Sequence, residues 1–161
     1  MTRFWLVIAV YLAVWTGPAS AQTNINLGGI TADASAAIEI SADNLSVDQD
    51  TGTAVFSGNV VIGQGDLRLS AGKVEVVYGG TTGQIARLMA TGGTTFVTAT
   101  EAAEANSADY NIESGYLVLK GDVLLTQGAS AISADQMSIN LGTGNAELSG
   151  RVRTVFQQGG N

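Results

Sequence analysis

The sequence contains no cysteine and no histidine, and its single proline, Pro18, lies near the N-terminus. The chain therefore has no thiolate nucleophile, and it lacks the side chain that most often serves as a general base or a metal ligand. Disulfides are also excluded, so a folded domain must be held by backbone pairing and by burial of apolar side chains. We expect this protein not to be an enzyme and to bind no metal and no cofactor.

Positive charge is scarce as well. Seven Lys and Arg residues stand against fourteen Asp and Glu residues, which gives a net charge of −7 at pH 7. This balance would repel the phosphate backbone of a nucleic acid, so we expect no nucleic-acid partner. The sequence also has no run of Lys or Arg that would dock it on an anionic membrane surface. If the ligand is an anionic lipid, its apolar chains must supply most of the attraction.

The N-terminus has the features of an export signal. Arg3 precedes an apolar run over residues 4–15, and residues 19–21, Ala-Ser-Ala, form a small-x-small cleavage site. The run is shorter than the roughly 20 residues that cross a membrane as a helix. We therefore predict a signal peptide over residues 1–21, followed by a flexible segment over residues 22–37.

Two short patterns alternate along the rest of the chain. The first is Ser-Ala-(Asp or Gly)-x-apolar, with the third copy shifted by one residue, and its copies begin at Ser41, Ser70, Ser107 and Ser133. The second is apolar-x-Gly-x-Val, and its copies are centred on Gly58, Gly121 and Gly150, with a degenerate copy over residues 90–94. Repeats at this spacing are typical of stacked structural units, so we expect an elongated fold.

Within each repeat the apolar residues recur with a period of two. Val60 and Ile62, for example, share one face, which is typical of a half-buried β-strand. Turn-forming residues separate the strand-like pieces at residues 50–52, 79–83 and 142–145. Glycine weakens the interior of a strand unless the backbone bends there. We therefore predict that Gly58, Gly121 and Gly150 are bends that let two sheets fold over each other.

Residues 48–52 match two functional patterns. They contain the Asp-Thr-Gly triplet of aspartic proteases, and they resemble the opening of a calcium-binding loop. However, no apolar strand precedes the triplet, and no bidentate Glu follows at the position that a calcium loop requires. We therefore predict a hairpin turn here.

Asp43, Asp109 and Asp135 recur at one point in each repeat. Such an array of carboxylates would also suit metal or general acid chemistry. Because each Asp precedes a predicted strand, we expect it to bind the amides of a turn or of the strand entry.

Residues 99–108 are the one stretch with some helical character. They are rich in alanine and include Glu101 and Glu104. Because they lack an apolar stripe, we expect a loop or a single turn instead.

The alternating apolar positions of the predicted strands make one long face. Its members include Leu45, Val47, Leu69, Val76, Leu119, Val123, Ile139 and Leu148. An ordinary dry core would show the same pattern. Only four Phe and four Tyr occur in the sequence, and Phe4 and Tyr11 fall within the predicted signal peptide, so aliphatic side chains must line most of this face. We therefore expect a loosely filled groove that suits acyl chains.

Several segments resemble a known family. They are Ile-Glu-Ile-Ser-Ala-Asp at residues 38–43, Phe-Ser-Gly-Asn-Val at 56–60, Leu-Arg-Leu-Ser-Ala-Gly-Lys-Val at 67–74 and Leu-Val-Leu-Lys-Gly-Asp-Val at 117–123. Together they resemble the OstA-like domain of the LptA family of periplasmic lipopolysaccharide-transport proteins. The resemblance spans residues 38–156 and leaves residues 157–161 as a flexible tail.

This resemblance implies an all-β fold, a twisted antiparallel β-jelly roll that is built from repeated strand pairs and is open at both ends. It also implies a periplasmic location and an interior that holds the acyl chains of lipid A. By their position within the motifs, the implied lipid-binding residues are Ile38, Phe96, Tyr110 and Ile112.

Members of the family stack end to end between an inner-membrane extraction complex and an outer-membrane translocon. The resemblance therefore implies as partners lipopolysaccharide, an LptC-like inner-membrane component, an LptD-like outer-membrane component and further copies in a head-to-tail homo-oligomer. An open jelly roll leaves unpaired strand edges at its ends. Glu39 on the first strand and Arg151 and Arg153 on the last have opposite charges, so we expect these residues to direct assembly.

Two alternatives stay open. The anchored LptC-like sister component shares the domain, although the cleavage site disfavours it. A structural β-repeat protein would use the same apolar face as a closed core. An interior that is open at its ends favours transport, and a closed interior with capped ends favours the structural protein.

Overall fold

The computed structural model describes residues 23–26, 33, 35–79 and 83–156. The predicted signal peptide and the predicted C-terminal tail lie outside these residues. Within the segment over residues 22–37, Thr23–Asn26 form a strand.

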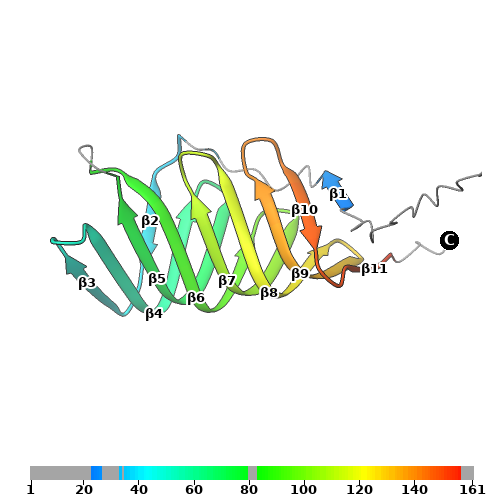
Figure 1. The fold of residues 1–161 in the computed structure, drawn as a ribbon, viewed down its shortest axis with the longest axis horizontal. Coiled ribbons are helices and arrows are strands. Elements are labelled where there is room, and N and C mark those ends of the chain that lie inside the picture. The colour runs from blue at the N-terminus through cyan, green and yellow to red at the C-terminus, as the bar shows by residue number, and fades with distance from the viewer. Residues whose placement is uncertain (1–22, 27–32, 34, 80–82, 157–161) are drawn as a thin grey trace, which may run out of the picture.

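The described residues contain eleven β-strands (Figure 1). They are β1 (Thr23–Asn26), β2 (Ile38–Ser41), β3 (Asn44–Asp48), β4 (Thr53–Gln64), β5 (Leu67–Tyr78), β6 (Ile85–Val97), β7 (Glu101–Asn111), β8 (Tyr116–Gln127), β9 (Ser130–Asn140), β10 (Asn145–Ser149) and β11 (Arg153–Val155). All belong to one antiparallel sheet with the order β1-β10-β9-β8-β7-β6-β5-β4-β2. In addition, β3 pairs with the first half of β4, and β11 pairs with the first half of β9. Figure 1 shows these strands side by side along an elongated molecule, with β3 at one end and β11 at the other.

The long strands bend near their middle. The register between β4 and β5 shifts between Ser57 and Val60, and similar shifts interrupt the β6–β7 and β8–β9 ladders. Gly58, Gly121 and Gly150, with φ of 79°, 81° and 74°, lie at these interruptions or between β10 and β11. This left-handed conformation is accessible to glycine at little cost, which explains why glycine recurs at these points. The predicted bends are confirmed.

The bends divide the sheet into two layers that share the long strands. The β2 layer contains β2, β11 and residues 60–64, 67–71, 94–97, 101–105, 123–127 and 130–134. The β3 layer contains β1, β3, β10 and residues 53–57, 73–78, 85–91, 107–111, 116–120 and 136–140. Alternate side chains of both layers are buried, for example Ile62 and Leu69 in the β2 layer and Val76 and Leu119 in the β3 layer. The core is therefore the space between the two layers, as in a β-sandwich.

The recurrent aspartates bind side chains at or near the bends. Asp43 accepts a hydrogen bond from Asn59 Nδ2 at 2.8 Å, and Asp135 accepts one from Arg151 Nε at 2.8 Å. Asp109 lies within β7 and accepts a hydrogen bond from Arg87 Nε on β6 at 2.7 Å. The prediction that these carboxylates bind turn or strand-entry amides is wrong, because their hydrogen bonds come from the side chains of Asn59, Arg87 and Arg151.

Residues 99–108 do not form the expected loop or single turn. Most of them belong to β7, which pairs with β6 on one side and with β8 on the other. Ala103, Ala105 and Ala108 point inward and are buried. Strand propensity depends on context, and here pairing with both β6 and β8 outweighs the low strand propensity of alanine.

Strand β3 also differs from the prediction, which placed Leu45 and Val47 on the buried face. These side chains are 56% and 61% exposed. Among the described strands, β3 pairs with β4 alone, so it is the end strand of its layer and has no neighbour on its other side.

The predicted hairpin turn at residues 50–52 is confirmed. The backbone N–H groups of Asp50 and Thr51 donate to Asp48 Oδ1 at 2.9 and 3.2 Å. This Asx-type turn joins β3 to β4. The predicted turn at residues 142–145 joins β9 to β10 in the same way, through the side chain of Asn140. In the predicted turn at 79–83, residues 80–82 lie outside the described part.

Gly121 and Gly93 allow the close approach at the bends to be tested separately from backbone strain. Their φ angles are 81° and 79°, but a β-carbon at Gly121 would lie 3.0 Å from the Cβ of Asn106, whereas one at Gly93 would have no neighbour within 4 Å. In both alanine variants the free energy of unfolding should fall by about 1 kcal/mol, because alanine is strained in the left-handed backbone conformation. In Gly121→Ala the free energy of unfolding should fall by about 2 kcal/mol more, because the added methyl group overpacks against Asn106. Urea unfolding followed by circular dichroism measures both, and equal losses would contradict this account of the bend.

Candidate functional site

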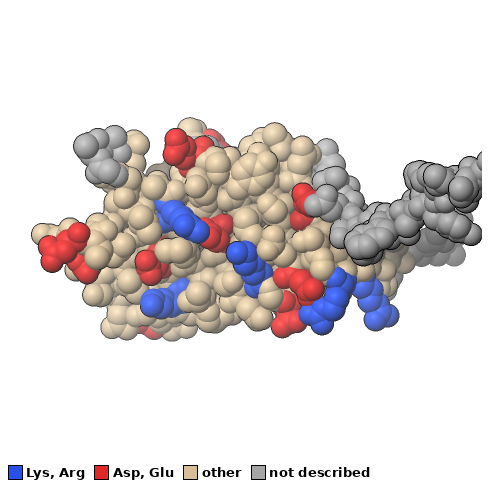
Figure 2. Space-filling view, viewed as in Figure 1, with Lys and Arg blue, Asp and Glu red and all other residues tan. Residues whose placement is uncertain are grey.

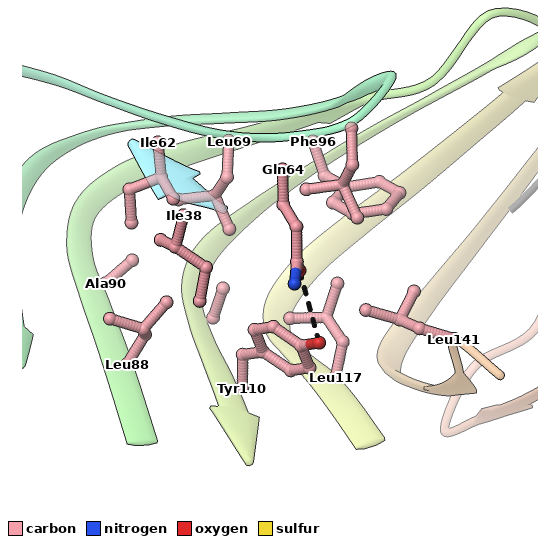
Figure 3. A pocket seen from close by; sticks show the side chains of 12 residues that line it. Ile38, Ile62, Gln64, Leu69, Leu88, Ala90, Phe96, Tyr110, Leu117 and Leu141 are labelled. Carbon is pink, nitrogen blue, oxygen red and sulfur yellow. Dashed lines mark hydrogen bonds between the residues drawn. The ribbon is translucent and has the colours of Figure 1, made fainter. Parts of the chain in front are cut away.

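A slot lies between the two layers. Its lining comes from both layers and consists of Ile38, Ile62, Gln64, Leu67, Leu69, Leu88, Ala90, Phe96, Ala108, Tyr110, Leu117 and Leu141 (Figure 3). Ten of these twelve side chains are wholly apolar, and the remaining two are Gln64 and Tyr110. The alternation within each strand directs these side chains inward, so the slot is a continuation of the core.

The slot is filled by its own side chains. Its free volume is about 20 Å³, which is about the space of one water molecule, whereas pockets that hold small molecules have volumes of about 300–1,000 Å³. The expectation of a loosely filled groove is therefore wrong for this structure. Aliphatic side chains from two closely facing layers fill the interior without large aromatic residues.

Three of the four residues that the family resemblance implied line the slot. Phe96 is fully buried, Tyr110 is nearly so, and Ile38 lies half-buried on β2 at the edge of its layer. Ile112 does not line it. Strand β7 ends at Asn111, and Ile112 lies in the following turn, where its N–H donates to the carbonyl of Ala86 at 3.0 Å.

Gln64 is a lining residue that the sequence analysis did not single out. It is only 3% exposed, its Nε2 donates to the carbonyl of Ala36, and its Oε1 accepts a hydrogen bond from the hydroxyl of Tyr110, each at 3.4 Å. The alternation of Val60 and Ile62 continues to Gln64, and this signal could have identified it. Burial raises the pKa of Tyr110, so its hydroxyl stays protonated and remains a donor at neutral pH.

The hydrogen bond between Gln64 and Tyr110 joins the two layers. Gln64 is the last residue of β4 in the β2 layer, and Tyr110 lies near the end of β7 in the β3 layer. Figure 3 shows the two side chains reaching toward each other from opposite sides of the slot. Both residues lie at strand ends away from the bends. Their bond therefore spans the side of the folded sheet opposite the bends, which we call the open side.

The three residues that we expected to direct assembly lie near opposite ends of the molecule. Glu39 is exposed on β2, and Arg153 is exposed on β11. Arg151 is paired with Asp135 of the same chain, and this hydrogen-bonded pair lowers the pKa of the Asp135 carboxyl. Figure 2 shows acidic side chains at the β3 end and basic side chains near the β11 end.

The described residues offer little for other kinds of site. They contain no group of three or more acidic, histidine or cysteine residues arranged to hold a metal ion. In the same part of the chain, no helix has the length and apolar character that would let it cross a membrane.

Comparison with known proteins identifies the family. Residues 39–145 match the family of LptA/(LptD N-terminal domain) LPS transport proteins. An uncharacterized protein of Rhizobium meliloti (strain 1021) is 30% identical over 134 residues, which cover 78% of this chain and 72% of that protein. This chain belongs to the LptA/(LptD N-terminal domain) family of LPS transport proteins, whose members are transport components rather than enzymes.

A solved structure supports the fold. The match is LptH, described as the LptA homologous periplasmic component of the conserved lipopolysaccharide transport device from Pseudomonas aeruginosa. Its TM-score is 0.71 at 16% identity, and the match covers 79% of this chain and 99% of the LptH chain. The predicted open, antiparallel β-jelly roll is confirmed.

Leu117 and Leu124 test how tightly the slot is packed. Both lie on β8, but Leu117 lines the slot and is 1% exposed, whereas Leu124 is 40% exposed on the outer face. Leu117→Ala should lower the free energy of unfolding by about 3 kcal/mol, because it leaves a cavity between the layers. Leu124→Ala should lower it by only about 0.5 kcal/mol. Thermal and urea unfolding provide the comparison, and a loss below about 1 kcal/mol at Leu117 would show that the interior collapses freely.

Proposed function

We propose that this protein binds lipopolysaccharide in the periplasm by holding the acyl chains of lipid A between the two layers of its sheet. The observation that carries the proposal is the apolar slot, which is lined from both layers and has only two polar side chains. Membership of the transport family and the likeness to the fold of periplasmic LptH support it. The acidic net charge of −7 also favours recognition through apolar chains over attraction of an anionic head group.

The slot must widen to admit acyl chains. The ladders of backbone hydrogen bonds run within each layer, and the layers are continuous only through the bends. Across the slot they are joined by apolar contacts and by the bond between Gln64 and Tyr110. Parting the layers on the open side breaks no ladder, and acyl chains replace the apolar contacts that are lost.

A purely structural β-repeat protein is the second candidate. The filled interior favours it, because a dry core needs no ligand. Family membership favours transport.

An anchored LptC-like component is a further alternative. It differs from a secreted carrier in keeping its N-terminal segment, and N-terminal sequencing of the protein from cells separates these two forms.

Photo-crosslinking tests lipid binding directly. Benzoylphenylalanine at Phe96, inside the slot, should crosslink to lipopolysaccharide in cells. The same residue at Leu45, which is exposed on β3, serves as the control and should not. Ile112, outside the slot, should crosslink more weakly than Phe96. Equal crosslinking from Phe96 and Leu45 would contradict binding between the layers, and no crosslinking from either position would favour the structural protein.

We further propose that copies associate head to tail and that the resulting bridge extends from an LptC-like to an LptD-like partner. Strand β2 is the end strand of the β2 layer at one end, and β11 is its end strand at the other. Neighbouring strands of the β2 layer alternate in direction. If this alternation continues from one copy to the next, β11 of one copy lies antiparallel to β2 of the next. Arg153 would then face the strand that carries Glu39, so opposite charges support this order of docking.

A charge exchange tests the docking. Arg153→Glu should weaken self-association about threefold, as expected for one exposed ion pair. Adding Glu39→Arg should restore association, because the charges are then exchanged. Lys73→Glu, on the outer surface of β5, is the control for net charge. Sedimentation velocity over a range of concentrations measures the effect. A double variant that stays as weak as Arg153→Glu would exclude this contact.

A further inference from the structure

An apolar core does not require the polar pair that lies within the slot. Gln64 and Tyr110 are 3% and 7% exposed, and the other ten lining residues are apolar. Apolar side chains in their place would avoid the cost of burying an amide and a phenol. In ligand pockets, a few polar groups on an apolar lining fix the orientation of the ligand and provide specificity.

The bond between the two side chains is long. The hydroxyl of Tyr110 lies 3.4 Å from Gln64 Oε1, whereas an O–H···O hydrogen bond is usually 2.5–3.0 Å. The bond from Gln64 Nε2 to the carbonyl of Ala36 is also 3.4 Å. Both groups therefore retain capacity for a better partner, and any widening of the slot lengthens their mutual bond further.

We propose that Gln64 and Tyr110 form a polar subsite that binds a hydroxyl group carried by an acyl chain. This inference rests on the proposed binding of acyl chains between the layers, and it names the kind of chain that the slot prefers.

The donor and acceptor roles of the pair select a hydroxyl. Tyr110 donates and Gln64 Oε1 accepts, so a group inserted between them must accept from one side and donate to the other. A hydroxyl group does both. A carbonyl oxygen accepts from Tyr110 but leaves Gln64 Oε1 unpaired. An unsubstituted chain leaves both groups unpaired, and buried unpaired groups cost free energy.

The position of the pair agrees with this role. It lies on the open side of the folded sheet, where an entering chain first parts the layers. A hydroxyl close to the carboxyl end of the chain would remain near this side while the rest of the chain lies among Leu69, Leu88 and Phe96. The phenol of Tyr110 is a donor at neutral pH, as any tyrosine is, and burial raises its pKa further.

Two acids of equal charge and length test the subsite. Tetradecanoic acid and 3-hydroxytetradecanoic acid compete with a fluorescent fatty acid for the purified protein. The wild type should bind the hydroxylated acid about fivefold more tightly, as expected for one additional net hydrogen bond. In Tyr110→Phe and Gln64→Leu this ratio should fall toward one. Tyr116→Phe removes a phenol hydroxyl from an exposed position and should keep the ratio of the wild type.

The outcomes separate this inference from the proposed function. Equal binding of the two acids by the wild type, or an unchanged ratio in Tyr110→Phe, overturns the hydroxyl subsite and leaves acyl-chain binding intact. If neither acid displaces the probe, binding of acyl chains between the layers fails, and the subsite fails with it. Circular dichroism confirms that each variant is folded, and the wild-type ratio alone decides the question if a variant is not.

Discussion

The bend that carries each long strand from one layer to the other is the constraint on which the rest of the structure depends. At Gly58 and Gly121 the backbone is left-handed, and the residue that follows each glycine also has a positive φ. A β-carbon would collide with Asp43, between β2 and β3, at Gly58, and with Asn106 of β7 at Gly121. Because these bends recur along one side, the strands fold into two facing layers, and every inward side chain of one layer meets those of the other.

This arrangement concentrates the ladder hydrogen bonds within the layers and leaves side-chain contacts to hold the layers together. In the interior these contacts include Phe96 and Leu117, which are fully buried. Toward the open side they include the long bond between Gln64 and Tyr110. The two layers therefore resist separation mainly through apolar contacts, which are non-directional and which an acyl chain reproduces. The proposed binding of acyl chains therefore requires little free volume in the unliganded slot.

The sequence predicted those features that local chemistry determines. Repeated glycines indicated the bends, and alternation indicated the strands. It did not predict the first part of β7, residues 101–106, because these residues are mainly alanine and glutamate and show no alternation of apolar side chains. It placed Leu45 on the buried face because alternation does not reveal which strand lies at an end. It missed Gln64 because a polar residue is ordinarily assigned to the outer face. It also predicted a loosely filled groove, because the sequence does not give the spacing between the layers, and this spacing determines how densely the interior is packed.

Strand β1 makes the two layers unequal. Without it each layer has eight strands, since β2 and β11 in one correspond to β3 and β10 in the other, and all six long strands are shared. With β1 on β10, the β3 layer has a ninth. Among the described strands, a second copy that extended both layers would find one edge of β11 without a partner, whereas β10 is already paired with β1 of the first copy. Its own β3 would reach β10 only in exchange for β1, so extending both layers in this way would require β1 to be displaced.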